Sequence, residues 1–238
     1  MLSNQEIRRY KKQILVPDFG EAGQEKLKKS RVIVIGAGGM GTAALQYLAS
    51  AGVGEIAICD NSIIEESDFQ NQLIFKSNDL GKHKSIVVKA NLESFNDLNT
   101  YTIFNIFISK ENAKIICSDF DLIIDTANDR KISQILDEVS SELNIPMVLS
   151  SCLQNKYTIA VLNFNKGPHL KEILFKENNH NAGANNLTSK TCFGASDGIA
   201  GSIVALEAIK ILSGKGEVLS NRILSIDPIN LKFEFTKF

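Results

Sequence analysis

A glycine-rich turn between two apolar stretches is the segment of this sequence whose residue types are best suited to chemistry. Residues 31–41 read RVIVIGAGGMG, so Gly36, Gly38 and Gly41 have the G-x-G-x-x-G spacing and Gly39 adds a fourth glycine. Glycines let the backbone turn tightly and approach phosphate oxygens, and the helix that follows presents free N–H groups to an anion. The segment therefore predicts a phosphate-binding loop.

An acidic residue follows at a distance that suits a ribose contact. Asp60 ends a second apolar stretch, residues 55–60, where its carboxylate is placed to accept hydrogen bonds from ribose hydroxyls. The combination predicts a nucleotide site, but the same spacing serves dehydrogenases, methyltransferases and adenylating enzymes. On these residues alone, a nicotinamide-dependent oxidoreductase stays open as an alternative.

Alternating strand and helix patterns surround these residues and must position them. Apolar runs with strand character alternate with amphipathic stretches, which predicts a Rossmann-like α/β fold with a doubly wound, mainly parallel sheet. The last strands alternate apolar and polar residues and are predicted to be antiparallel. Helices are predicted at residues 40–50, 82–95, 111–117, 132–143 and 199–212, and strands at residues 32–35, 55–60, 101–108, 121–126, 146–151, 157–164, 222–227 and 231–236.

The length of 238 residues and the hydrophobic content of 44% suit one domain, residues 1–238. Residues 1–30 are predicted to be a helical lead-in. Residues 165–195 are polar and asparagine-rich, and we expect a flexible crossover loop over a site there. No internal repeat or dividing linker is evident.

Composition argues against several classes of protein. Lys plus Arg (26) nearly balance Asp plus Glu (27), which does not favour nucleic acid or an anionic membrane as partner. The sequence has neither a signal-peptide core nor an apolar run long enough to cross a bilayer, so we expect a cytoplasmic protein. The four cysteines form no C-x-x-C pair, and no zinc site is predicted.

Four separated groups of residues follow one pattern along nearly the whole chain. They are residues 9–15 with 20–27, 36–41 with 51–54, 60–72 with 81–84, and 201–212 with 224–227. In this combination the chain resembles the ThiF/MoeB/HesA superfamily, bacterial relatives of the ubiquitin-activating enzymes. The combination is far more specific than the glycine loop alone.

The resemblance implies an adenylyltransferase that uses ATP and Mg²⁺. A carboxylate, usually the C-terminal glycine of a ubiquitin-like sulfur carrier of thiamine or molybdopterin-type synthesis, would attack the α-phosphate and expel pyrophosphate. It assigns Asp60 to the ribose, places Ser62 in the nucleotide segment, and assigns Lys84 to the phosphates. Lys12 stands where the family commonly has an arginine that reaches into a partner subunit, which implies a homodimer; a lysine keeps the charge without the bidentate fork.

Two departures from the family pattern fall at catalytic positions. Where the family reads Ser-Asn-Leu-x-Arg-Gln, residues 67–72 read SDFQNQ, so Asn71 replaces the arginine. Asn128 likewise replaces the magnesium-associated aspartate, which leaves Asp129 as the candidate for Mg²⁺ and Asp125 as its alternative. Losing one preorganised charged donor costs about 3 kcal/mol, or roughly a hundredfold in rate.

Two further features follow from the resemblance. The paired C-x-x-C motifs of a structural zinc are missing, and Cys192 lies near the position where family members often carry a thiol that receives the activated carrier. An alternative therefore stays open: a divergent or inactive member that supports a partner subunit in a heterodimer, lending Arg8, Arg9 or Lys12, or that acts on a peptide in a modification pathway.

Overall fold

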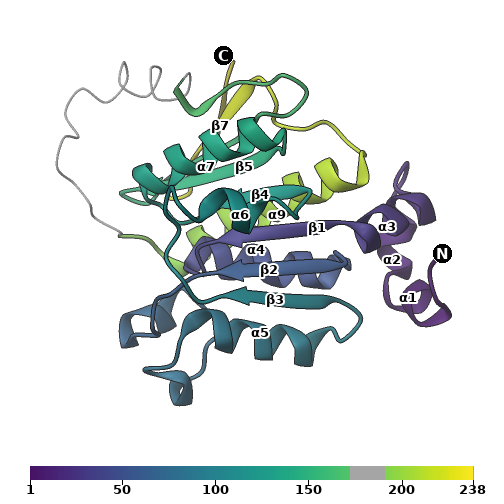
Figure 1. Ribbon diagram of the computed structural model, residues 1–238, viewed down its shortest axis with the longest axis horizontal. Coiled ribbons are helices and arrows are strands. Elements are labelled where there is room, and N and C mark those ends of the chain that lie inside the picture. The colour runs from purple at the N-terminus through teal and green to yellow at the C-terminus, as the bar shows by residue number, and fades with distance from the viewer. Residues whose placement is uncertain (172–190, 238) are drawn as a thin grey trace.

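The computed structural model describes residues 1–171 and 191–237 and shows one eight-stranded sheet with helices on both faces (Figure 1). The strand order is β3-β2-β1-β4-β5-β6-β7-β8. The strands are β1 (Arg31–Ile35), β2 (Glu55–Cys59), β3 (Thr100–Phe104), β4 (Leu122–Asp125), β5 (Met147–Leu153), β6 (Lys156–Leu162), β7 (Arg222–Asp227) and β8 (Lys232–Lys237).

The first five strands are parallel and the last three are antiparallel, as the sequence predicts. In register, Val32 pairs with Ile56 of β2 on one side and with Leu122 of β4 on the other. Strand order therefore reverses between β1 and β4, and in open α/β sheets the crevice outside the carboxyl ends at such a point is where ligands bind. The fold thus brings the residues that follow β1 and β4 to one place.

Alternating side chains of the buried strands build two cores. Val32 and Val34 face one core, and Ile33 and Ile35 face the other. The first core lies under α4, α5 and α9, the second under α6 and α7 (Figure 1). The helices are α1 (Asn4–Arg9), α2 (Lys11–Ile14), α3 (Gly20–Lys29), α4 (Gly39–Ala51), α5 (Lys84–Phe95), α6 (Ala113–Cys117), α7 (Arg130–Leu143) and α9 (Gly194–Ser213), with the 3-10 helices η1 (Glu66–Gln70) and η2 (Ser77–Asp79).

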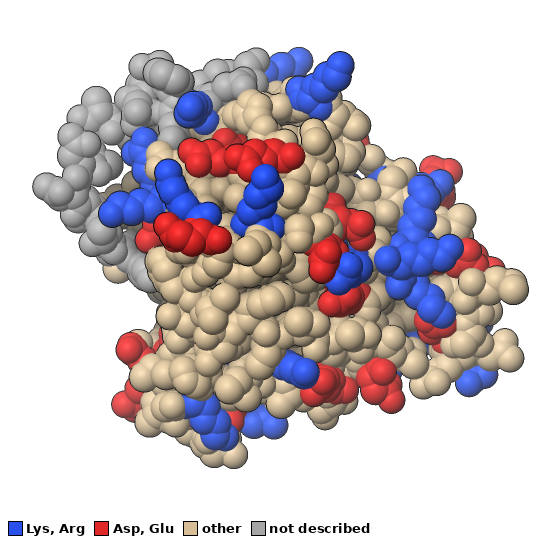
Figure 2. Space-filling view, in the orientation of Figure 1, with Lys and Arg blue, Asp and Glu red and all other residues tan. Residues whose placement is uncertain are grey.

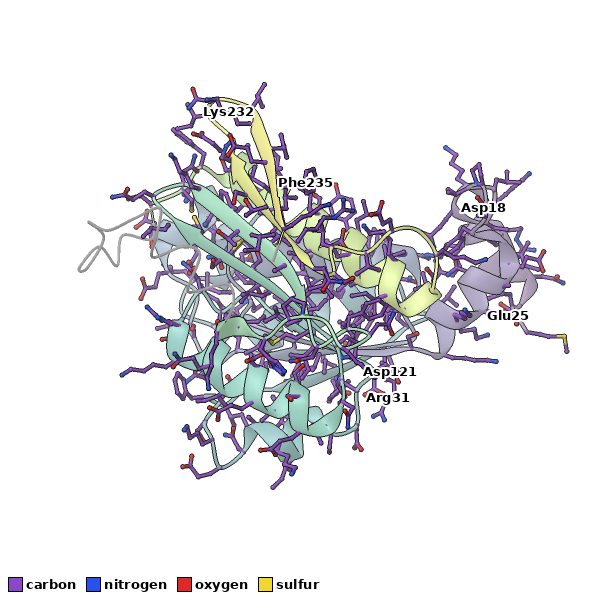
Figure 3. All side chains as sticks on the ribbon, turned by 90° about the horizontal axis from the view of Figure 1, so that it is seen from above. Asp18, Glu25, Arg31, Asp121, Lys232 and Phe235 are labelled. Atoms are coloured by element: carbon purple, nitrogen blue, oxygen red, sulfur yellow. The ribbon has the colours of Figure 1, made fainter. Side chains whose placement is uncertain are left out.

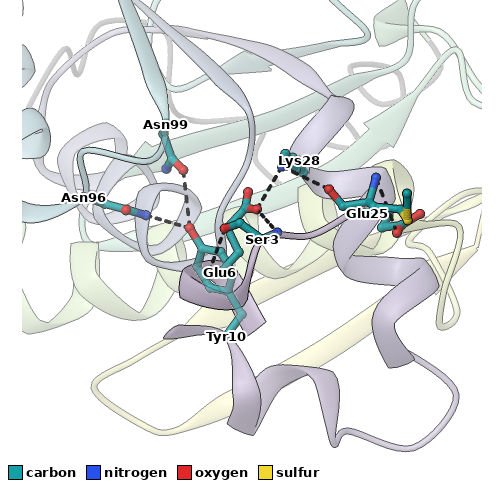
Figure 4. Close-up of polar contacts among 8 residues, drawn as sticks. Ser3, Glu6, Tyr10, Glu25, Lys28, Asn96 and Asn99 are labelled. Atoms are coloured by element: carbon teal, nitrogen blue, oxygen red, sulfur yellow. Dashed lines mark hydrogen bonds and ion pairs between the residues drawn. The ribbon is translucent and has the colours of Figure 1, made fainter. Parts of the chain in front are cut away.

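The N-terminal segment is helical, as predicted, and polar contacts fasten it to the sheet domain (Figure 4). Ser3 and Glu6 form a capping box at the start of α1, and Glu6 also pairs with Lys28 of α3 at 2.8 Å. The buried Tyr10 hydroxyl accepts a hydrogen bond of 3.0 Å from Asn96 Nδ2. Because α3 leads directly into β1, these helices lie at the amino end of the parallel strands.

Most elements match the sequence prediction to within two residues at each end, and β3 and α9 differ by more. β3 ends at Phe104 rather than at residue 108, because its partner β2 ends at Cys59, the last residue paired with it. α9 begins at Gly194, five residues before the predicted start, so residues 194 and 195 of the expected loop are helical. Residues 172–190 of that loop lie outside the described residues, and the rest of the prediction for it is not tested.

The surface carries both signs of charge. Figure 2 shows acidic and basic side chains interspersed over the face that it presents, in keeping with a formal net charge of −1. Figure 3 shows Lys232 and Phe235 of the edge strand β8 well apart from Asp18 and Glu25 of the N-terminal segment. Of the helices in the described ranges, none is long and apolar enough to cross a membrane.

Candidate functional site

A cavity of about 890 Å³ lies at the carboxyl ends of the central strands, where strand order reverses. Its size suits a small ligand or cofactor. The predicted site residues that line it come from six segments distant in sequence: Gly36, Gly38, Gly39, Asp60, Ser62, Asn71, Lys84, Asn128, Asp129 and Cys192. Gly41, Lys12 and Asp125, which the sequence also singles out, are outside this lining.

Two glycines of the loop are required by close backbone approach. Gly36 has φ +99°, and a Cβ on it would lie 2.9 Å from the Ala127 backbone. A Cβ on Gly41 would lie 2.0 Å from the Gly36 carbonyl oxygen, which also accepts a hydrogen bond of 2.8 Å from Thr126 Oγ1. Gly38, by contrast, has no neighbour within 4 Å of an added Cβ and faces open space. The loop is therefore held by Gly36 and Gly41 and presents Gly38 to the cavity.

Asp60 joins the glycine loop to the loop that follows β2. Its Oδ2 accepts a hydrogen bond of 2.7 Å from Ala37 N–H, and its Oδ1 accepts one of 2.7 Å from Ser62 N–H. An ionised carboxylate has about four acceptor positions, so each oxygen keeps one for a ligand hydroxyl. The carboxylate is half-buried at the pocket wall, a position that suits the predicted ribose contact.

Lys84 lies at the start of α5 and is paired with a carboxylate that the sequence prediction did not include. Its Nζ lies 2.9 Å from Asp68 Oδ2, and the two side chains are 10% and 15% exposed. Asp68 Oδ1 accepts a hydrogen bond of 2.6 Å from Gln72 Nε2, and Oδ2 accepts one of 2.9 Å from Glu65 N–H. Both Lys84 and Asp68 line the pocket.

A buried carboxylate, Asp197, lies in the pocket wall beside Gly39 at the start of α4. Asn71 Nδ2 donates to its Oδ2 at 2.8 Å, and the Tyr157 hydroxyl donates to its Oδ1 at 2.8 Å. The Cys192 thiol also donates to Oδ2 at 3.2 Å. Burial, reinforced by Asp197, raises the pKa of Cys192 to about 11 and that of Tyr157 well above its usual range. Cys192 is thus a protonated thiol at neutral pH.

Sequence reasoning missed Asp197 altogether. It lies just before residues 199–212, which read as an apolar helix, and nothing near it in sequence marks it as part of a site. The one available signal was an acidic residue at the start of an otherwise apolar helix. An aspartate buried by such a helix needs polar partners, so it marks a place where other polar side chains gather.

The residues after β4 are committed to backbone contacts. Asn128, at φ +53°, donates through Nδ2 to the Cys152 carbonyl oxygen at 3.0 Å and accepts from Cys152 N–H through Oδ1 at 2.8 Å. Asp129 caps α7, since its Oδ1 accepts hydrogen bonds from the N–H groups of Lys131 and Ile132. Asn128 therefore ties the end of β4 to β5.

Asp125 is turned away from the pocket, which removes it as the alternative metal residue. It is fully buried, and its Oδ2 accepts a hydrogen bond of 2.5 Å from Ser133 Oγ. Burial raises the pKa of Asp125 to about 6. A group hidden in the core in this way serves the fold rather than a ligand.

The carboxylates of the pocket suit magnesium better than a metal that needs a full set of protein ligands. Within the described ranges, no group of three or more His, Cys, Asp or Glu side chains is placed to hold a metal ion. Mg²⁺ does not need such a group, because it keeps several waters and binds through one or two carboxylates plus substrate phosphates. Asp129 fits that mode: it is exposed at the pocket wall and uses only Oδ1 for its cap.

Lys12 lies far from the pocket of its own chain. It is an exposed residue of α2, in the segment at the amino end of β1, whereas the pocket lies at the carboxyl ends (Figure 1). A contact between Lys12 and a ligand in this pocket would therefore need a second copy of the chain.

Comparison with known proteins supports one family along the chain. The sequence model of the ThiF family matches residues 10–238. A probable molybdopterin-synthase adenylyltransferase from Porphyra purpurea is 33% identical over 232 residues, which cover 98% of this chain and 61% of the relative. An adenylyltransferase and sulfurtransferase MOCS3 from Xenopus laevis is 32% identical, with coverage of 99% and 52%. A sulfur carrier protein adenylyltransferase from Thermus thermophilus is 29% identical, with coverage of 97% and 87%.

Solved structures share the fold. The crystal structure of PaaA has a TM-score of 0.84 and 21% identity, covering 100% of this chain and 84% of that one. E. coli MccB with ATP has a TM-score of 0.79 and 22% identity, covering 91% and 65%. The family model, which matches residues 10–238, shows that the chain belongs to the ThiF family.

Proposed function

We propose that this protein uses ATP to adenylate a carboxylate, the C-terminal glycine of a ubiquitin-like sulfur carrier or of a peptide. The observation that carries the proposal is the pocket itself, in which the glycine loop, Asp60 and Lys84 face one cavity at the point where strand order reverses. A nicotinamide-dependent oxidoreductase would explain the loop and Asp60 but not Lys84.

The residues present fit the steps of such a reaction. Asp60 holds the ribose hydroxyls, while the glycine loop and the N-terminus of α4 face the phosphates. The substrate carboxylate attacks the α-phosphate and pyrophosphate leaves, and Lys84 stabilises the charge on the leaving group. Positioning and charge do most of the work, because phosphoryl transfer needs little covalent help from the protein.

Magnesium would be held at the wall of the pocket by Asp129, with water and phosphate oxygens completing its shell. Its chemistry there is neutralisation of phosphate charge. We further propose a cytoplasmic homodimer, in which Lys12 of each copy reaches the partner's pocket, because Lys12 lies too far from its own.

The names of the relatives support the substrate class. The Thermus thermophilus relative is named for a sulfur carrier protein, and one MccB structure contains ATP. This chain spans only 61% and 52% of the length of the Porphyra purpurea and Xenopus laevis relatives. The activity of those longer proteins is therefore a proposal for this chain.

The test is ATP–pyrophosphate exchange with the purified protein and a carrier or peptide that ends in Gly-Gly. We expect label exchange that depends on this carboxylate and is lost when its C-terminus is amidated. Exchange that is absent with every carboxylate, from a folded protein that binds ATP, would contradict adenylation.

A second function has support from two substitutions. Asn71 is bonded to Asp197 and Asn128 to Cys152, so neither is free to replace the charged residue that the family pattern has there. A protein that binds ATP without exchange, and that restores activity to a homologue with the usual arginine, would be a supporting subunit.

A further inference from the structure

Two features of the pocket suit a phosphate group, namely the Lys84 ammonium group and the N-terminus of α4, and each lies beside an aspartate of the same chain. The ammonium group of Lys84 lies 2.9 Å from Asp68 Oδ2. At the start of α4, Asp197 lies against Gly39, because a Cβ on that glycine would be 2.0 Å from Asp197 Oδ2. Since a helix N-terminus carries partial positive charge, both cationic features have carboxylate counter-charges before any ligand arrives.

These carboxylates are fixed in place rather than loosely held. Asp68 accepts hydrogen bonds from Gln72 Nε2 and Glu65 N–H, in addition to its ion pair. Asp197, only 3% exposed, accepts from Asn71 and Tyr157. Buried and half-buried charges are screened far less than surface charges, so Asp197 repels an anion in the pocket and Asp68 competes with a phosphate for Lys84.

The pocket as a whole is acidic. Among the described residues that line it, five are carboxylates and one, Lys84, is an ammonium, which gives a formal net charge of −4. A free triphosphate brings several more negative charges. Repulsion of like charges at these distances weakens binding by factors of ten or more.

An unpaired acceptor lies beside Asp68. Gln72 Oε1 is buried without a hydrogen-bond partner, although Gln72 belongs to the pocket wall and its Nε2 is bonded to Asp68. Buried polar atoms are nearly always paired in a complete structure. This wall can therefore accept one more hydrogen bond, which a water in the shell of a bound cation would supply.

We propose that Asp68 and Asp197 are specificity-determining residues, which exclude free ATP and admit the nucleotide only with a divalent cation that offsets their charge. The inference rests on the proposed function. It assigns a role to Asp68, at a position where the family pattern has asparagine, and to Asp197, which no sequence motif marks.

Titration calorimetry tests the proposal with ATP in excess magnesium chloride and with ATP in EDTA. For the unmodified protein we expect the Kd in EDTA to be at least about a hundredfold weaker. Asp68→Asn and Asp197→Asn should each tighten binding of ATP in EDTA by about tenfold and narrow the ratio between the two conditions. Glu65→Gln is the matched control, because Glu65 is an exposed carboxylate of the same pocket and should change the ratio by less than about twofold.

Each outcome is decisive. Equal affinity of the unmodified protein in both conditions would overturn the inference without any variant, and so would an equal effect of all three substitutions. Thermal melting of each variant separates a lost fold from a changed affinity. No binding of ATP even with magnesium would contradict the proposed function, and this inference with it.

Discussion

The two walls of the pocket are built in different ways. The wall that contains Asp60 is held by backbone donors, since the Asp60 carboxylate accepts hydrogen bonds from the N–H groups of Ser62 and Ala37. The second wall joins the side chains of Asn71, Tyr157, Cys192 and Asp197, which come from three segments distant in sequence. In the first wall backbone N–H groups hold the carboxylate, whereas in the second wall side-chain donors hold it.

The difference means that substitutions of side chains in the second wall can change the charge of the pocket while the backbone contacts of the first wall stay the same. On the side of the glycine loop, backbone geometry fixes the contacts. At Asp68 and Asp197 the charge depends on the side chain, so a substitution there can alter the site without altering the fold.

The largest effect is expected from substitution of Lys84, which lines the pocket and pairs with Asp68. Lys84→Ala should lower the rate of ATP–pyrophosphate exchange by about a thousandfold, because it removes the only cation among the described lining residues. Lys82→Ala is the control: Lys82 is 53% exposed, pairs with Asp79 and is outside the lining. If both variants lose the same activity, Lys84 has no special role.

The glycine loop should separate packing from binding. Gly41→Ala should lower the free energy of unfolding by about 3 kcal/mol, because its Cβ would meet the Gly36 carbonyl oxygen at 2.0 Å. Gly38→Ala should change it by less than about 0.5 kcal/mol, since nothing lies within 4 Å, while weakening ATP binding. Urea unfolding and titration calorimetry measure the two quantities. Equal losses of stability would refute this account of the loop.

Asp125 predicts a pH dependence of stability. Its folded pKa of about 6 lies above the unfolded value of about 3.9, so the folded state favours the protonated acid. The stabilisation is complete below about pH 4 and is lost as pH rises through about 6, on the order of 2–3 kcal/mol. Urea unfolding across this range should show the loss in the unmodified protein and not in Asp125→Asn. If the free energy of unfolding depended on pH in the same way for both proteins, Asp125 would not be the source of the effect.

The smallest effect concerns the wall around Asp197. Tyr157→Phe removes the hydroxyl that donates to Asp197 Oδ1 at 2.8 Å and should cost about 1–2 kcal/mol of stability. Tyr47→Phe is the control, because Tyr47 is 55% exposed and should cost almost nothing. Thermal unfolding compares them, and a cost at Tyr157 no larger than at Tyr47 would mean that the hydrogen bond contributes little.

Local patterns in the sequence predicted the fold and part of the site. The glycine spacing and strand periodicity place Gly36 and Asp60 in one pocket, because parallel strands bring their carboxyl ends together. Lys84 was assigned through the family resemblance, and it lines the same pocket. The pairing of Lys84 with Asp68 and the burial of Asp197 could not be predicted from the sequence, since each depends on side chains that meet only in the folded chain. The early end of β3 could not be predicted either, because it depends on the partner strand β2, whose last paired residue is Cys59.

The central claim is that the pocket binds ATP. Titration calorimetry of the unmodified protein with ATP in magnesium chloride, with NAD as the competing ligand, tests it most directly. The account predicts a Kd for ATP in the micromolar range and no measurable binding of NAD. Binding of NAD with no binding of ATP would contradict it and would return the glycine loop to the oxidoreductase alternative.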